Sequence, residues 1–192
     1  MEKAHMILDP RGQIERTKLI LADRPSLEEL KKGKLLIYNN TKVEFCNYTE
    51  IIPQLKECFS EIGVTEFEEF RRTVRGLTNQ NLRELAQELT EHNPTAAVIV
   101  LGDMGVSPAS AILTIELEKR GVPAVLITAS PGAELACAVA DYRAGRLCLC
   151  PIDLYQGTSR ESIREQIKGC FAFIQDCLTG TPDMVERCAA LD

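Results

Sequence analysis

The residues best suited to chemistry lie in one short loop, residues 102–107, which links an apolar run to a predicted helix. Asp103 could act as a general base or hydrogen-bond to nearby amides, and Ser107 could cap the helix, donate to a ligand or act as a nucleophile. A serine nucleophile needs a base within reach, and neither His5 nor His92 has a recognisable partner in the sequence. Because amides and the positive end of a helix dipole gather at such a loop, it predicts a catalytic site for a small carboxylate or carbonyl compound.

The other residues of this loop are predicted to surround the substrate. Gly102 and Gly105 permit backbone conformations and close approaches that other residues do not, and Met104 and Val106 complete the lining. Met104 is the unusual member, because a thioether at a loop tip cannot serve as a redox thiol, an acid or a base. We expect these four residues to bind substrate.

A second polar loop, residues 39–42, follows the apolar run at residues 34–38. Asn40 and Thr41 are residue types that favour turns and offer side-chain hydrogen bonds. Lys42 could hold a carboxylate or phosphate across a crevice, or it could be an ordinary solvated side chain. We expect Asn40 and Thr41 to bind substrate and Lys42 to join the catalytic residues.

Hydrophobic patterning predicts the elements that must position these loops. Residues 96–101 form an apolar run without charge that ends at a glycine, which favours a strand buried on both faces. Ser107 followed by Pro108 predicts an N-cap and the first helical position, and the helix is expected to end near Gly121. Five strand-like runs alternate with helical patterns, at residues 34–38, 64–70, 96–101, 123–128 and 146–150.

This alternation predicts an α/β fold, a Rossmann-like or flavodoxin-like parallel sheet of about five strands with helices on both faces. In the simplest strand order, 2-1-3-4-5, the topological switch point lies between the first and third strands. Ligands bind outside the carboxyl ends of the strands at such a point. The fold is therefore expected to bring the loops at residues 39–42 and 102–107 together.

The composition indicates a soluble globular protein of one domain, with 192 residues of which 45% are hydrophobic and 26% charged. We expect residues 34–180 to form the α/β domain. Residues 1–33 are predicted to be an N-terminal arm that packs on this domain or on another subunit, with a short capped helix beginning at Ser26. Residues 181–192 are predicted to be a C-terminal helix or tail.

Charge and motif content argue against several function classes. The net charge is −6 and no basic cluster is present, so no nucleic-acid partner is expected. No apolar run is long enough to span a membrane and no signal-peptide core is evident, so we expect a cytoplasmic protein without a membrane partner. The eight cysteines are then interpreted as reduced thiols. Because neither a GxGxxG motif nor a phosphate-loop motif occurs, no cofactor is expected.

Cys148 and Cys150 lie two residues apart on a predicted strand and should face the same side. They could form a thiol pair or contribute to a metal site. Without a second cysteine motif or a nearby histidine, however, no metal site is expected. His92, near a predicted helix end, is interpreted as a partner of the helix dipole.

Several segments match a known pattern in order along the chain. Gly-Asp at residues 102–103 precedes MGVS, and ELEKRGVP follows at residues 116–123. NTK at residues 40–42 and ADRPSL at residues 22–27 lie upstream. This arrangement resembles the selenoprotein B subunits of glycine, betaine, sarcosine and D-proline reductases. It resembles still more closely the family named for its UGSC motif, which is selenocysteine or cysteine followed by Gly, Ser and Cys.

The resemblance implies a selenol or thiol that attacks a substrate carbon or a carbonyl adduct, with a helix N-terminus lowering the pKa of the nucleophile. The redox selenocysteine or cysteine of the family falls on Met104 in this chain, and its resolving cysteine falls on Ser107. The redox half-reaction therefore cannot be carried over to these positions.

Two interpretations of different classes follow. In the first, the chain is a non-redox subunit of a reductase or lyase complex, forming a homo-oligomer or a hetero-oligomer with a paralogue that keeps the intact motif. In the second, it is a stand-alone enzyme of altered chemistry, in which Asp103, Ser107 and Lys42 assist bond cleavage or proton transfer. A third possibility is that Cys148 or Cys150 has become the nucleophile.

Overall fold

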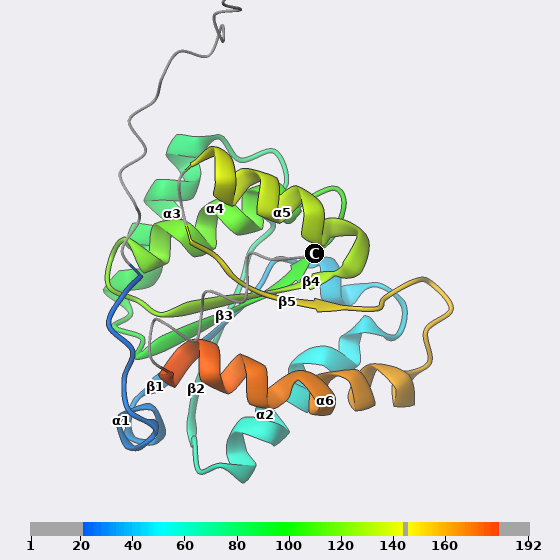
Figure 1. Ribbon diagram of the computed structural model, residues 1–192, viewed down its shortest axis with the longest axis horizontal. Helices are drawn as coiled ribbons and strands as arrows, with labels where there is room; N and C mark the ends of the chain where they lie inside the picture. Colours follow the sequence, from blue (N-terminus) through cyan, green and yellow to red (C-terminus); the bar gives the residue numbers. More distant parts are fainter. Residues whose placement is uncertain (1–20, 144–145, 181–192) are drawn as a thin grey trace, which may run out of the picture.

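The computed structural model of the chain describes residues 21–143 and 146–180. Within them lies a five-stranded parallel sheet with the order β2-β1-β3-β4-β5 (Figure 1). The strands are β1 (Lys34–Asn39), β2 (Glu66–Arg71), β3 (Ala96–Gly102), β4 (Ala124–Ala129) and β5 (Cys148–Ile152). This is the flavodoxin-like order expected from the sequence, and it confirms the α/β fold.

Helices cover both faces of the sheet (Figure 1). One face carries α3 (Asn79–Glu91), α4 (Ser107–Glu118) and α5 (Ser130–Tyr142), and the other carries α2 (Ile51–Glu61) and α6 (Arg160–Thr179). The short helix α1 (Leu27–Lys32) precedes β1. Two 3-10 helices, η1 (Lys42–Glu44) and η2 (Cys46–Glu50), lead from β1 into α2.

The middle strand, β3, is buried along its whole length. Val98 and Val100 pack into the core beneath α2 and α6, while Ala97 and Ile99 pack into the core beneath α3, α4 and α5. A strand covered by helices on both faces needs apolar side chains at every position, which explains the continuous apolar run in the sequence.

The start of α4 differs by one residue from the sequence prediction. Val106 is the N-cap residue, and Ser107 is the first residue of the helix and makes no capping side-chain hydrogen bond. Instead, Oδ1 of Asp103 accepts hydrogen bonds from the amides of Gly105 (2.9 Å) and Val106 (3.0 Å). Aspartate and serine are both suited to bind free amides near a helix start. Here the aspartate side chain binds the two amides that directly precede α4.

Residues 21–33, the described part of the predicted arm, pack on the α/β domain of the same chain. The short capped helix that was predicted here is α1, with Ser26 as its N-cap residue in a capping box with Glu29. Arg24 forms a buried bidentate ion pair with Glu118 (2.7 and 2.8 Å), and the same carboxylate accepts a hydrogen bond from the amide of Ala124 (2.8 Å). These contacts fasten the segment to the end of α4 and the start of β4. The rest of the predicted arm and the predicted tail lie outside the described residues.

Candidate functional site

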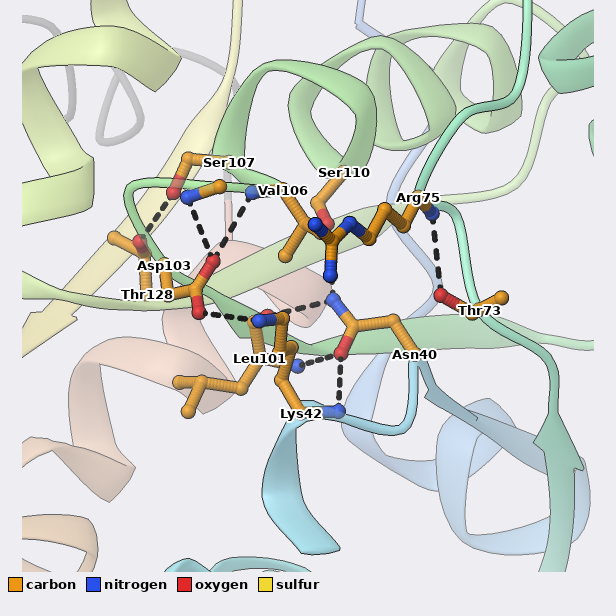
Figure 2. Close-up of polar contacts among 11 residues, drawn as sticks. Asn40, Lys42, Thr73, Arg75, Leu101, Asp103, Val106, Ser107, Ser110 and Thr128 are labelled. Atoms are coloured by element: carbon orange, nitrogen blue, oxygen red, sulfur yellow. Dashed lines mark hydrogen bonds and ion pairs between the residues drawn. The ribbon is translucent and has the colours of Figure 1, made fainter. Parts of the chain in front are cut away.

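The loops that follow β1 and β3 meet at the carboxyl ends of the strands, and Asn40 joins them (Figure 2). Asn40 is fully buried, and its side chain donates to the carbonyl of Leu101 (2.6 Å) and accepts from the amide of Leu101 (3.1 Å). The same side chain donates to the hydroxyl of Ser110 (3.1 Å) and accepts from the amide of Lys42 (3.1 Å). Because both N–H groups and the oxygen are engaged within the protein, Asn40 is placed to position the two loops.

The turn at Thr41 carries Lys42 across to the second loop. Thr41 has a left-handed backbone conformation (φ 73°), and its amide donates to the side chain of Asn39 (2.8 Å). As a result, Nζ of Lys42 lies 2.9 Å from Oδ2 of Asp103. The two side chains are 25% and 35% exposed, so this ion pair faces a solvent-accessible space and contributes only about 0.2–1 kcal/mol to stability.

Asp103 fills the turn that the sequence predicted as an anion site. Its Oδ1 binds the amides of Gly105 and Val106, its backbone carbonyl accepts from the amide of Ser107 (2.7 Å), and its Oδ2 binds Lys42. Three amides that were expected to face a substrate, those of Gly105, Val106 and Ser107, are therefore bound to Asp103. The ammonium group of Lys42 has three N–H donors, of which the ion pair with Asp103 needs only one.

Ser107 is enclosed between α4, β4 and α5. Its side chain is fully buried, and its Oγ lies 3.0 Å from Oγ1 of Thr128 (Figure 2). Gly102 and Gly132 make room for this contact: a Cβ added to Gly132 would lie 2.3 Å from Oγ of Ser107, and one added to Gly102 would lie 2.5 Å from Oγ1 of Thr128. Gly102 is thus required for close approach, whereas Gly105 is exposed and a Cβ there would meet only the Asp103 carboxylate at 3.4 Å.

A cavity of about 360 Å³ opens beside the Lys42–Asp103 pair on the α2 and α6 side of the sheet. Its walls come from the segments that follow β1, β3, β4 and β5, and they are mostly apolar. The lining residues are Lys42, Phe45, Cys46, Tyr48, Leu101, Asp103, Met104, Ala129, Pro131, Leu154 and Gln156. A volume of this size suits a small organic molecule.

The structure distributes the predicted site residues over three environments. Lys42, Asp103 and Met104 line the cavity, and Met104 stands 69% exposed at its rim. Asn40 and Thr41 form the turn that supports Lys42. The remaining predicted residues do not line the cavity: Gly102, Val106 and Ser107 are buried beneath the loop, and Gly105 is exposed on its outer side.

Sequence reasoning missed the η1–η2 segment as part of the site. Phe45 lies with its ring centre 5.7 Å from Nζ of Lys42, a cation–π contact. Cys46 is an exposed free thiol with a left-handed backbone (φ 51°). Burial raises the pKa of the Tyr48 phenol, and the nearby Cys46 and Asp103 raise it further, so the hydroxyl stays protonated. The available signal was proximity in sequence, since all three residues follow directly on the predicted Lys42 loop.

A further cationic side chain, that of Arg75, is drawn with the site residues in Figure 2. Arg75 belongs to the loop that follows β2, and its amide donates to the hydroxyl of Thr73 (3.2 Å). Its exposed side chain points toward Ser110, near the start of α4 (Figure 2). The sequence offered no pattern that marked this arginine.

The candidate thiol pair lies away from the cavity. Cys148 and Cys150 are both buried in β5, and Cys148 accepts a hydrogen bond from Arg24 (3.3 Å). His92 is the C-cap residue of α3, and its Nδ1 lies 2.5 Å from a carboxylate oxygen of Glu68. Within the described part of the chain, no group of three or more His, Cys, Asp and Glu side chains could hold a metal ion. None of the described helices combines the length and hydropathy needed to cross a bilayer.

Comparison with known protein families finds a match that covers most of the chain. The model of the UGSC family matches residues 6–180, a range that contains the whole sheet, the Lys42–Asp103 pair and the cavity. No curated protein and no solved structure shows significant similarity to the chain. The chain, whose loops meet at the carboxyl ends of β1 and β3, therefore belongs to the UGSC family.

Proposed function

We propose that the chain is an enzyme that binds a small carboxylate or carbonyl compound in the cavity and assists proton transfer or bond cleavage on it. The observation that carries the proposal is the cavity itself, whose mostly apolar walls end at the ammonium group of Lys42. Such a site favours a ligand with an apolar body and one oxygen-bearing end, because the body fills the apolar space and the oxygen accepts a hydrogen bond.

In this proposal, Lys42 is the group that contacts substrate. One N–H of its ammonium points to Asp103, and the others are available to a ligand oxygen, where they stabilise negative charge that develops in the reaction. Asp103 orients Lys42 and shapes the loop, since its two carboxylate oxygens already accept hydrogen bonds from Lys42 and two amides. Ser107 supports the same loop from below through Thr128.

The relation to selenoprotein B is part of this proposal. The motif of the family corresponds to residues 104–107, where this chain has Met-Gly-Val-Ser. With a thioether at Met104 and a hydroxyl at Ser107, a selenol or thiol exchange at these two positions is not proposed. The chemistry assigned to the cavity is therefore non-redox.

A second function is favoured by the apolar surface around the cavity mouth. Phe45, Met104 and Tyr155 are 61%, 69% and 68% exposed, and each lines the cavity or adjoins a residue that does. Exposed large apolar side chains gathered at one place are typical of protein interfaces. They support a non-redox subunit, which we propose to be cytoplasmic, whose cavity mouth is covered by a second copy or by a paralogue with an intact motif.

Isothermal titration with butyrate and with butanal tests the proposed ligand site. Lys42→Met should weaken binding roughly tenfold to a hundredfold, because a hydrogen bond to a charged group is worth about 1.5–3 kcal/mol. Lys56→Met is the matched control, since Lys56 forms a similar ion pair with Glu69 (3.0 Å) outside the cavity. Equal losses in the two variants, or no binding by the wild type, would refute the ligand site. Co-purification of a paralogue with the wild type, but not with Met104→Glu, would favour the subunit instead.

A further inference from the structure

The cavity contains a reactive group that neither the family motif nor the predicted site includes. Cys46 lines it together with Lys42, Tyr48 and Asp103, so a thiol, an ammonium, a phenol and a carboxylate share one space. Cys46 is exposed, whereas Cys58, Cys148 and Cys150 are buried in the cores. Among the described cysteines, Cys46 is the one that lines the cavity.

We propose that Cys46 is the nucleophile of the cavity and adds reversibly to the carbonyl carbon of a bound aldehyde or reactive ketone. This inference rests on the proposed function and narrows its substrate class, because a carboxylate carbon is a poor electrophile whereas an aldehyde carbon accepts a thiol readily. The known motif positions, Met104 and Ser107, play no part in the step.

The step is an addition and needs no oxidant or reductant. A bond forms between Sγ of Cys46 and the carbonyl carbon, and the π electrons of the C=O bond move to the oxygen. The thiol proton is transferred to that oxygen, so the product is a neutral thiohemiacetal. Reversal of the same steps releases the thiol and the intact carbonyl compound.

The neighbouring groups are suited to this addition. The Lys42 ammonium can donate to the carbonyl oxygen as charge develops on it, and Asp103 holds that ammonium in place. The Tyr48 hydroxyl remains protonated, because burial and its neighbours raise its pKa, and it can relay the thiol proton by giving its own proton to the oxygen and taking up the one that Cys46 releases. The apolar walls reduce competition from water for the carbonyl carbon.

The test uses butanal labelled with ¹³C at the carbonyl carbon and observed by NMR with the full chain. We expect the aldehyde signal to give a thiohemiacetal signal with the wild type and no such signal with Cys46→Ser. We also expect adduct formation to be at least tenfold more favourable than with glutathione in the same buffer, because glutathione lacks the cavity. An adduct that persists in Cys46→Ser, or one no stronger than that of glutathione, overturns the inference.

Two further measurements keep the outcomes distinct. Lys42→Met should weaken the adduct, whereas Lys56→Met should not. Cys46→Ser should melt within about a degree of the wild type, because Cys46 is exposed, so loss of the adduct in this variant does not result from unfolding. If butyrate binds in a Lys42-dependent way but butanal forms no adduct, the inference fails and the proposed function stands. If neither compound binds, both fail.

Discussion

Replacing Asn40 with alanine should destabilise the fold and weaken ligand binding together. The side chain of Asn40 satisfies both backbone groups of Leu101, at 2.6 and 3.1 Å, in a fully buried environment. The register between β3 and β4 passes from Val100 to Gly102, so Leu101 is skipped in the ladder with β4. Its amide and carbonyl therefore depend on Asn40.

The expected magnitude follows from these two groups. A buried donor or acceptor without a partner costs about 1–3 kcal/mol, so Asn40→Ala should lower the free energy of unfolding by about 3 kcal/mol. The same substitution frees the amide of Lys42, which loosens the turn that holds the ammonium beside the cavity. Butyrate affinity should therefore fall even under conditions in which the variant is fully folded.

Urea unfolding followed by circular dichroism measures the first effect, and calorimetric titration at low temperature measures the second. Asn47→Ala is the matched control, because Asn47 is half-buried and its side chain donates to the carbonyl of Thr158 (3.0 Å) and accepts from the exposed Arg160 (3.4 Å). Asn47→Ala should lower the free energy of unfolding by about 1 kcal/mol or less. If Asn40→Ala loses no more stability than Asn47→Ala, with equal m-values, Asn40 does not join the loops as described.

Other parts of the structure give three further predictions. Arg24→Met should cost about 3–5 kcal/mol in urea unfolding, because it leaves the carboxylate of Glu118 buried without its cation, and a loss under 1 kcal/mol would contradict that contact. Gly132→Ala should cost about 1–3 kcal/mol, since the new Cβ would lie 2.3 Å from Oγ of Ser107, and addition of Ser107→Ala should recover part of the loss. Burial raises the pKa of Glu116, but hydrogen bonds and charges from basic side chains one turn later outweigh it and hold the pKa below its usual range. The stability that Glu116→Gln removes should therefore be present above the ordinary glutamate pKa and should disappear as the pH falls through the lowered value, and a stability difference independent of pH would contradict this.

The fold could be predicted from the sequence because its signals are local. The apolar run of β3 is continuous since helices cover both faces of the strand, and the glycine after it marks where the strand ends. When strands alternate with helices, right-handed crossovers permit only a few sheet topologies. The topological switch point then follows from the strand order. This reasoning correctly brought Lys42 and Asp103 to one crevice, although they are far apart in the sequence.

The detail of the site depended on contacts between distant segments. Asp103 and Ser107 are both capping residue types, and the sequence could not decide which one would bind the amides directly before α4. The burial of Ser107 depends on Thr128 and on the missing side chain of Gly132, which belong to later elements. The cavity likewise needs Leu154, which lies beyond β5. Hydrophobic periodicity in the sequence does not indicate such contacts between distant segments.

Chemical-shift mapping with ¹⁵N-labelled protein and unlabelled butyrate shows whether this cavity is the functional site, since it reports where a small carboxylate binds. We expect saturable shifts in the segments that wall the cavity, at residues 42–48, 101–104, 129–131 and 154–156. Lys42→Met should abolish these shifts and Lys56→Met should leave them unchanged. Shifts confined to another surface, such as the exposed face of α3, or no saturable shift at any concentration would contradict the claim that this cavity is the functional site.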